Sequence, residues 1–74
     1  MSWLDEFGLS HSQREALIDE WIFSERDRAI LKRRYLDKIH IEPLAEEFCL
    51  SVRQINYILA EAKAILLPKI NNLH

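Results

Sequence analysis

The chain has 74 residues, of which 49% are hydrophobic and 30% are charged, and its formal net charge is −2. This length holds one hydrophobic core and leaves no room for a second domain of ordinary size. The composition is typical of a folded protein rather than a disordered one, and one Gly and two Pro are too few for the turns of a small β-protein. We therefore predict one all-α domain over 1–74, a compact bundle of three to four helices.

The sequence also bears on the compartment of the protein. Its apolar runs fall short of the roughly 20 residues that cross a bilayer, and Asp5 and Glu6 stand where a signal peptide would be basic. Cys49 is the single cysteine, which agrees with a reducing compartment. We expect a cytoplasmic protein with no membrane partner.

Serine residues mark the starts of three helices, because each is followed three positions later by Gln, Glu or Asp in the pattern of an N-cap. These are Ser10 (or Ser12) for the first helix, Ser24 for the second and Ser51 for the last. A short helix with Pro43 in its first turn lies between the second and the last. The predicted helices cover 10–22, 24–37, 42–48 and 51–67, after an N-terminal segment at 1–9 and before a frayed tail at 71–74.

Apolar residues in these helices recur at the spacing of one buried helix face. The predicted inward residues are Ala16, Leu17, Ile18 and Trp21 in the first helix, Ile30, Leu31 and Tyr35 in the second, and Ile55, Ile58, Leu59, Ala62, Ile65 and Leu66 in the last. Pro68 is predicted to end the last helix, because proline lacks the N–H that a continuing helix needs.

The junction between the last two helices has the pattern of a helix-turn-helix. Ala45 is a small residue where two helices cross, and Leu44, Phe48 and Leu50 are apolar residues that brace the turn. Ser51 then starts a helix at the position from which a recognition helix enters the major groove. The pattern predicts a C-terminal helix-turn-helix that binds double-stranded DNA.

Residues 28–37 (RAILKRRYLD) and 44–55 (LAEEFCLSVRQI) resemble the promoter-reading region 4 of bacterial sigma factors. They are also similar to small phage and mobile-element regulators that share this helix-turn-helix. The resemblance covers about residues 16–67 and implies a four-helix fold whose last helix reads promoter or operator DNA, with RNA polymerase as a further partner. Full sigma factors carry additional domains, so we do not expect this chain alone to initiate transcription.

Three features depart from the family pattern. Cys49 occupies the turn position where glycine is usual, so positive φ, some strain and a half-buried side chain are expected. The usual Ser or Thr cap is missing at 40–42, and Arg53 is the one cation in the first three turns of the last helix. These departures predict a loose start for the third helix and modest DNA affinity.

The outward start of the last helix holds the predicted DNA-binding residues, which are Ser51, Val52, Arg53, Gln54, Asn56 and Tyr57. Arg53 suits a guanine, Gln54 or Asn56 an adenine, and Tyr57 a phosphate or a thymine methyl. For Asn56 and Tyr57, a solvated surface role is an equal alternative. The predicted phosphate contacts are Arg33, Lys38 and Lys63.

Further along the same face, Ala60, Ala64 and Leu67 are small or apolar, which favours a homodimer through this stripe with help from Trp3, Leu4 and Phe7. Arg34 is expected to pair with Glu46 or Glu47. The histidines His11, His40 and His74 lack metal-ligand spacing, and neither a nucleophile–base pair nor a glycine-rich phosphate loop is present. We therefore expect no metal, cofactor, small-molecule substrate or enzymatic activity.

Charge alternates by segment: residues 1–23 sum to −4, 24–40 to +3, 41–50 to −3 and 51–74 to +2. This alternation fits a basic face turned toward phosphates, and it fits ordinary pairing between neighbouring helices equally well. Two functions follow. The first is a DNA-binding transcriptional regulator, and the second is a protein-interaction module, an adaptor or polymerase-associated domain, that keeps the fold without specific DNA binding.

Overall fold

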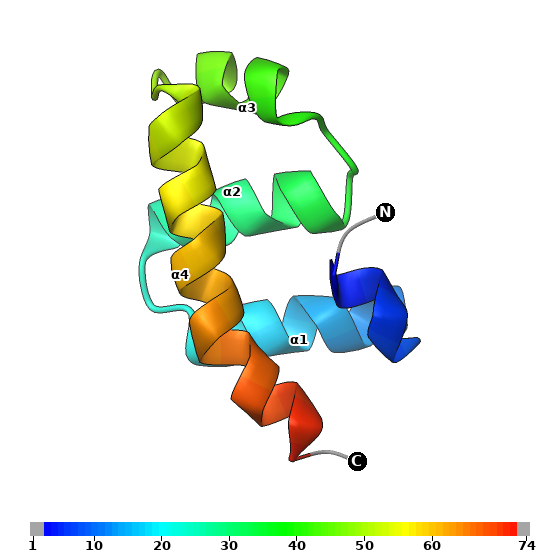
Figure 1. Ribbon diagram of the computed structural model, residues 1–74. Helices are drawn as coiled ribbons and strands as arrows, with labels where there is room; N and C mark the ends of the chain where they lie inside the picture. The colour runs from blue at the N-terminus through cyan, green and yellow to red at the C-terminus, as the bar shows by residue number, and fades with distance from the viewer. Residues whose placement is uncertain (1–2, 73–74) are drawn as a thin grey trace.

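The computed structural model describes residues 3–72, which form four α-helices and a short 3-10 helix (Figure 1). The elements are η1 (Trp3–Phe7), α1 (His11–Trp21), α2 (Glu25–Tyr35), α3 (Ile41–Glu47) and α4 (Val52–Asn71). The predicted all-α architecture is confirmed for the described part of the chain, and each predicted helix begins within one residue of the observed start. Of the predicted tail, 71–72 belong to α4 and its cap, whereas Leu73 and His74 lie outside the described residues.

The predicted serine caps are formed. Ser10 and Ser51 each make a reciprocal capping box with the glutamine three residues later, with donor–acceptor distances of 2.8 to 3.2 Å. Ser24 accepts a hydrogen bond from the backbone N–H of Asp27 at 3.3 Å. His40 caps α3 without a side-chain hydrogen bond, as its sequence predicts. Local capping therefore fixes where α1, α2 and α4 begin.

Helix α4 continues through Pro68 to Asn71, so the prediction that it ends at 67 is wrong. Pro68 removes one hydrogen bond, to the carbonyl of Ala64, and both residues are exposed, so water can satisfy that carbonyl. Beyond the proline, Ile70 is completely buried. Burial of one large apolar side chain contributes about 1.5 to 3 kcal/mol, which offsets the lost bond.

Two hydrophobic clusters form the core, and α4 contributes to both. The larger lies between η1, α1, α2 and the C-terminal half of α4, and the smaller lies between α2, α3 and the N-terminal half of α4. Leu59, midway along α4, packs against both clusters. Figure 1 shows α4 running the length of the molecule, across α2 and α1 and up to α3.

Most predicted core residues are buried, but two predicted inward positions are wrong. Ala16 is exposed because α1 turns the larger Leu17 and Ile18 toward the core instead. Ile65 is 41% exposed, since the buried stripe of α4 is centred on Ala62 and Leu66 and leaves Ile65 at its edge. Each correction reflects which side chains on a helix have the most apolar area to bury.

The N-terminal segment docks on the body of the protein through η1. Leu4 is 1% exposed, and Trp3 Nε1 donates a hydrogen bond to the Tyr35 hydroxyl at 3.1 Å. Arg14 and Asp5 form an ion pair at 3.0 Å. Burial raises the pKa of Tyr35, partly opposed by its bond to Trp3. The predicted contribution of this segment to self-association is therefore wrong for Leu4, which the chain's own core covers.

Leu4→Ala tests whether η1 belongs to the folding unit. Loss of this buried side chain should lower the free energy of unfolding by about 2 to 5 kcal/mol, measured by urea denaturation. Glu6→Ala, on the exposed side of the same short helix, serves as the control and should change it by less than about 0.5 kcal/mol. Equal stabilities for the two variants would show that η1 is not part of the cooperative core.

Candidate nucleic-acid interface

The connection between α3 and α4 is short and tightly hydrogen-bonded. Leu44 and Ala45 of α3 are buried against α4, with Phe48 and Leu50 packed around them. After α3 ends, the Leu50 N–H donates to the Ala45 carbonyl at 2.9 Å and the Cys49 N–H donates to the Glu46 carbonyl at 3.2 Å. Ala45 is therefore buried in the cluster between α2, α3 and α4, and Phe48 and Leu50 pack against the same cluster.

Cys49 has φ = 56°, the positive value that its place in the turn predicts. Its side chain is exposed, so the prediction of a half-buried cysteine is wrong. The neighbouring Leu50 fills the inner side of the turn instead. Left-handed backbone at a residue with a Cβ costs about 1 to 2 kcal/mol, and the surrounding hydrogen bonds hold Cys49 there.

The predicted DNA-binding residues lie together at the start of α4, and all six are exposed: Ser51, Val52, Arg53, Gln54, Asn56 and Tyr57. The capping box engages Ser51 Oγ and Gln54 Oε1, so the Gln54 side chain is held against the helix start, whereas Asn56 has no side-chain hydrogen bond to any described residue. Bidentate pairing with adenine needs both a donor and an acceptor.

A hollow of about 270 Å³ lies beside these residues, between the start of α2 and the first turns of α4. Arg26 and Arg53 both line it, together with Tyr57. The carboxylate of Glu61, one turn further along α4, hydrogen-bonds the Tyr57 phenol and raises its pKa. The sequence pattern does not predict that Arg26 and Arg53 are neighbours. They line the same hollow because α2 packs against α4.

The three predicted phosphate contacts do not gather at this place. Arg33 Nη2 lies 2.9 Å from Glu47 and its Nη1 lies 3.1 Å from Asp37, so two carboxylates already occupy its guanidinium. Lys63 Nζ lies 5.7 Å from the centre of the Trp3 ring, toward the other end of α4. Lys38 is exposed in the α2–α3 connection, with φ = 60°.

The predicted ion pair between α2 and α3 exists with a different arginine. Arg33, rather than Arg34, pairs with Glu47, and no ion pair joins Arg34 to Glu46 or Glu47 within residues 3–72. Arg34 Nη1 instead donates to the Ile39 carbonyl at 3.2 Å. The carboxylates of Glu47 and Asp37 raise the pKa of Arg33. The two arginines are adjacent in sequence and therefore point about 100° apart around α2.

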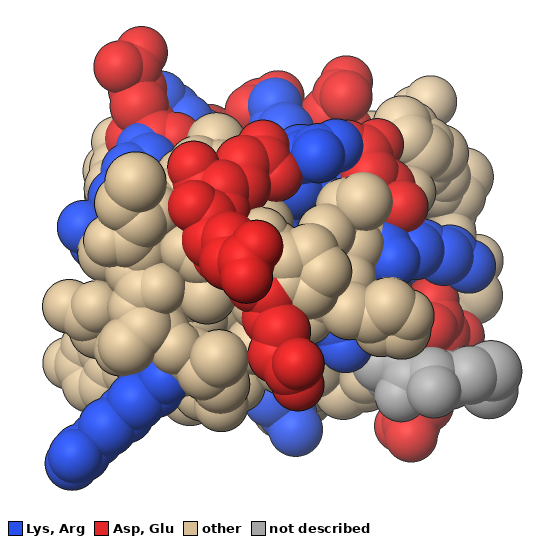
Figure 2. Space-filling model, turned by 90° about the horizontal axis from the view of Figure 1, so that it is seen from above, with Lys and Arg blue, Asp and Glu red and all other residues tan. Residues whose placement is uncertain are grey.

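Acidic side chains lie close to the candidate interface. Figure 2 views the molecule from the α3 end and shows a band of acidic groups across the middle of that face, with basic groups on both sides. Helix α3 exposes Glu42, Glu46 and Glu47. A polyanion would approach Arg26 and Arg53 more favourably than it would approach α3.

Neither a membrane-spanning helix nor a metal-binding group is found in the described part of the chain. None of its helices is long and apolar enough to cross a bilayer, and no three His, Cys, Asp or Glu side chains are placed to hold a metal ion. His74 lies outside that part. Comparison with protein-family models, characterised proteins and solved structures finds no match for this chain.

Cys49→Gly should stabilise the protein, because glycine adopts positive φ without the Cβ penalty. Part of that gain is lost to the greater freedom of glycine in the unfolded chain, so we expect about 0.5 to 1 kcal/mol more stability in thermal or urea unfolding. Cys49→Ala keeps the Cβ and should bring no gain. A glycine variant no more stable than the alanine variant would contradict the strained turn.

Proposed function

We propose that this chain is a DNA-binding transcriptional regulator in which α3, the turn and α4 form a helix-turn-helix. The observation that carries the proposal is the exposed, capped start of α4, where six polar, aromatic or small side chains face solvent beside Arg26. The resemblance to sigma-factor region 4 and to small phage or mobile-element regulators supports the same function.

The residues divide into two roles. In this proposal Arg53, which makes no ion pair with any described residue, donates two hydrogen bonds to guanine, and Asn56 pairs with adenine. Arg26 is exposed, and its ion pair with the neighbouring Asp27 is a surface contact at 3.3 Å that a phosphate can replace. Base contacts then specify the site while Arg26 fixes the position on the backbone.

A second candidate function has its own support. The acidic band on the α3 face favours a protein-interaction module whose partner presents a basic segment there (Figure 2). We place it second because the hollow lined by Arg26 and Arg53 has no acidic side chain among the described residues of its lining. The two candidates differ in one measurable property, the enrichment of a sequence motif from random duplex DNA.

Selection from random duplex DNA should enrich a short motif, and Arg53→Ala should weaken binding to that motif by about 1 to 3 kcal/mol with relaxed preference at one base pair. Fluorescence anisotropy on the selected duplex measures both effects. Lys63→Ala removes one positive charge further along the same helix and should change affinity much less. A selection without enrichment at low salt would favour the protein-interaction module.

Arg26→Ala should have a different signature because it removes a backbone contact. Affinity should fall by a similar factor on selected and random duplexes, and the slope of log K against log salt should decrease by about 1. Titrations at several salt concentrations measure the slope. An unchanged slope would remove Arg26 from the interface while leaving the role of Arg53 intact.

A further inference from the structure

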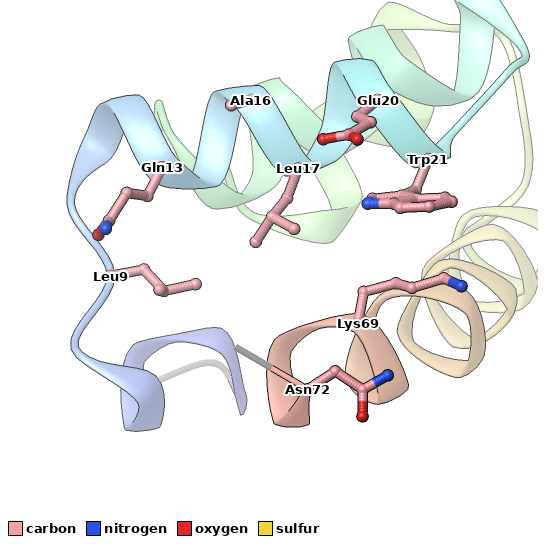
Figure 3. A pocket seen from close by; sticks show the side chains of 8 residues that line it. All are labelled: Leu9, Gln13, Ala16, Leu17, Glu20, Trp21, Lys69 and Asn72. Atoms are coloured by element: carbon pink, nitrogen blue, oxygen red, sulfur yellow. The ribbon is translucent and has the colours of Figure 1, made fainter. Parts of the chain in front are cut away.

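A groove lies away from the start of α4. It has a volume of about 510 Å³ and runs between α1 and the last turns of α4 (Figure 3). Leu17 and Trp21 project into it from α1, facing Lys69 of α4 and Asn72, the residue that caps α4, while Glu20 stands at its rim. An apolar floor with a few polar groups at its edge is typical of a binding surface.

The apolar surface extends beyond the groove at its Trp21 end. Ile22 is 5% exposed and has an extended backbone, so the next side chain, Phe23, projects away from the core, whereas Trp21 is half-buried and packs against the larger cluster. On α4, Ile65 precedes Lys69 by one turn and shares its helix face. Phe23 is 81% exposed and Ile65 is 41% exposed. These two exposed apolar side chains are therefore near groove-lining residues in the chain, Phe23 two positions after Trp21 and Ile65 one helical turn before Lys69.

We propose that this surface is a homodimer interface in which Phe23 of each copy inserts into the groove of the other. The exposed Phe23 ring follows the groove residue Trp21 by two positions, so each copy carries a projecting ring close to a hollow that accepts it, as an isologous two-fold contact requires. The occupant is thus a second copy of this chain. A single unfilled groove would suit many partners, but the adjacent projection makes the surface complementary to itself.

The charges at the rim agree with a second copy. Glu20 and Lys69 have opposite signs and make no ion pair with each other or with other described residues, although Lys69 Nζ lies 4.2 Å from the centre of the Trp21 ring. A two-fold axis near Trp21 brings Lys69 of one copy toward Glu20 of the other, twice. Interface charges arranged in this way favour the correct partner and orientation.

This interface leaves the start of α4 free. Lys69 is 16 positions after Arg53 on the same helix, which corresponds to about 24 Å at 1.5 Å per residue. The interface also differs from the predicted stripe, where Ala60 and Ala64 are exposed but add little apolar area and Leu67 is already partly buried. The dimer is therefore independent of the proposed DNA binding.

Sedimentation equilibrium of the full chain, without DNA, tests the interface over a range of protein concentrations. The natural chain should form dimers reversibly, and Phe23→Ala should raise the dimer dissociation constant by about tenfold or more, as expected for an aromatic anchor. Ala64→Glu, in the predicted stripe, is the matched control and should leave it nearly unchanged. Circular dichroism checks that both exposed positions tolerate substitution without loss of helix.

A charge exchange tests the two-fold arrangement. Glu20→Lys and Lys69→Glu should each weaken the dimer, and the double exchange should restore it, because the pairs re-form between copies with reversed sign. Thermal unfolding of the same variants measures how much stability is lost when Lys69 no longer stacks on Trp21 within one copy. That loss can then be distinguished from weaker pairing between copies.

Four outcomes would overturn the proposal: a monomer at every concentration, a dimer insensitive to Phe23→Ala, a dimer broken only by Ala64→Glu, or masses that rise beyond the dimer as an open-ended contact would give. Loss of dimerisation with DNA selectivity retained would leave the proposed function standing.

Discussion

Helix α4 holds the molecule together because one buried stripe on it forms a wall of both hydrophobic clusters. Ile55 and Ile58 pack with α3 and α2, whereas Ala62, Leu66 and Ile70 pack with η1, α1 and α2. Helix α2 also contributes to both clusters, but Leu59 of α4 packs against the two of them at once. The buried stripe explains why α4 runs through Pro68: the last turns bury Ile70, and only an exposed hydrogen bond is lost.

Because α4 packs against both clusters, its two ends lie in different parts of the molecule and take different proposed roles. Its N-terminal end is anchored by the short turn after α3, which leaves Arg53 and Asn56 in solvent beside Arg26. Its C-terminal end packs along α1 and leaves a groove at Trp21. One rigid helix thus joins a proposed DNA-reading end to a proposed dimer interface, and two linked reading ends offset a weak single site.

Local signals predicted the helices well, because a serine cap and an apolar spacing of 3.6 residues act within one segment. Properties that depend on packing between segments were less predictable. The pairing of Arg33 rather than Arg34 with Glu47 depends on how α2 rotates against α3. The meeting of Arg26 with Arg53 joins residues far apart in sequence, and the exposure of Ile65 depends on which neighbouring side chains fill the core.

The most direct test of the central claim is a map of the DNA contact surface by amide chemical shifts in the full, isotope-labelled chain titrated with a selected duplex. We predict that the changes concentrate on residues 51–57 and the start of α2, and that they weaken with added salt. Changes confined to the acidic face of α3 or to the groove at Trp21, or no changes at low salt, would contradict the proposal that the start of α4 reads DNA.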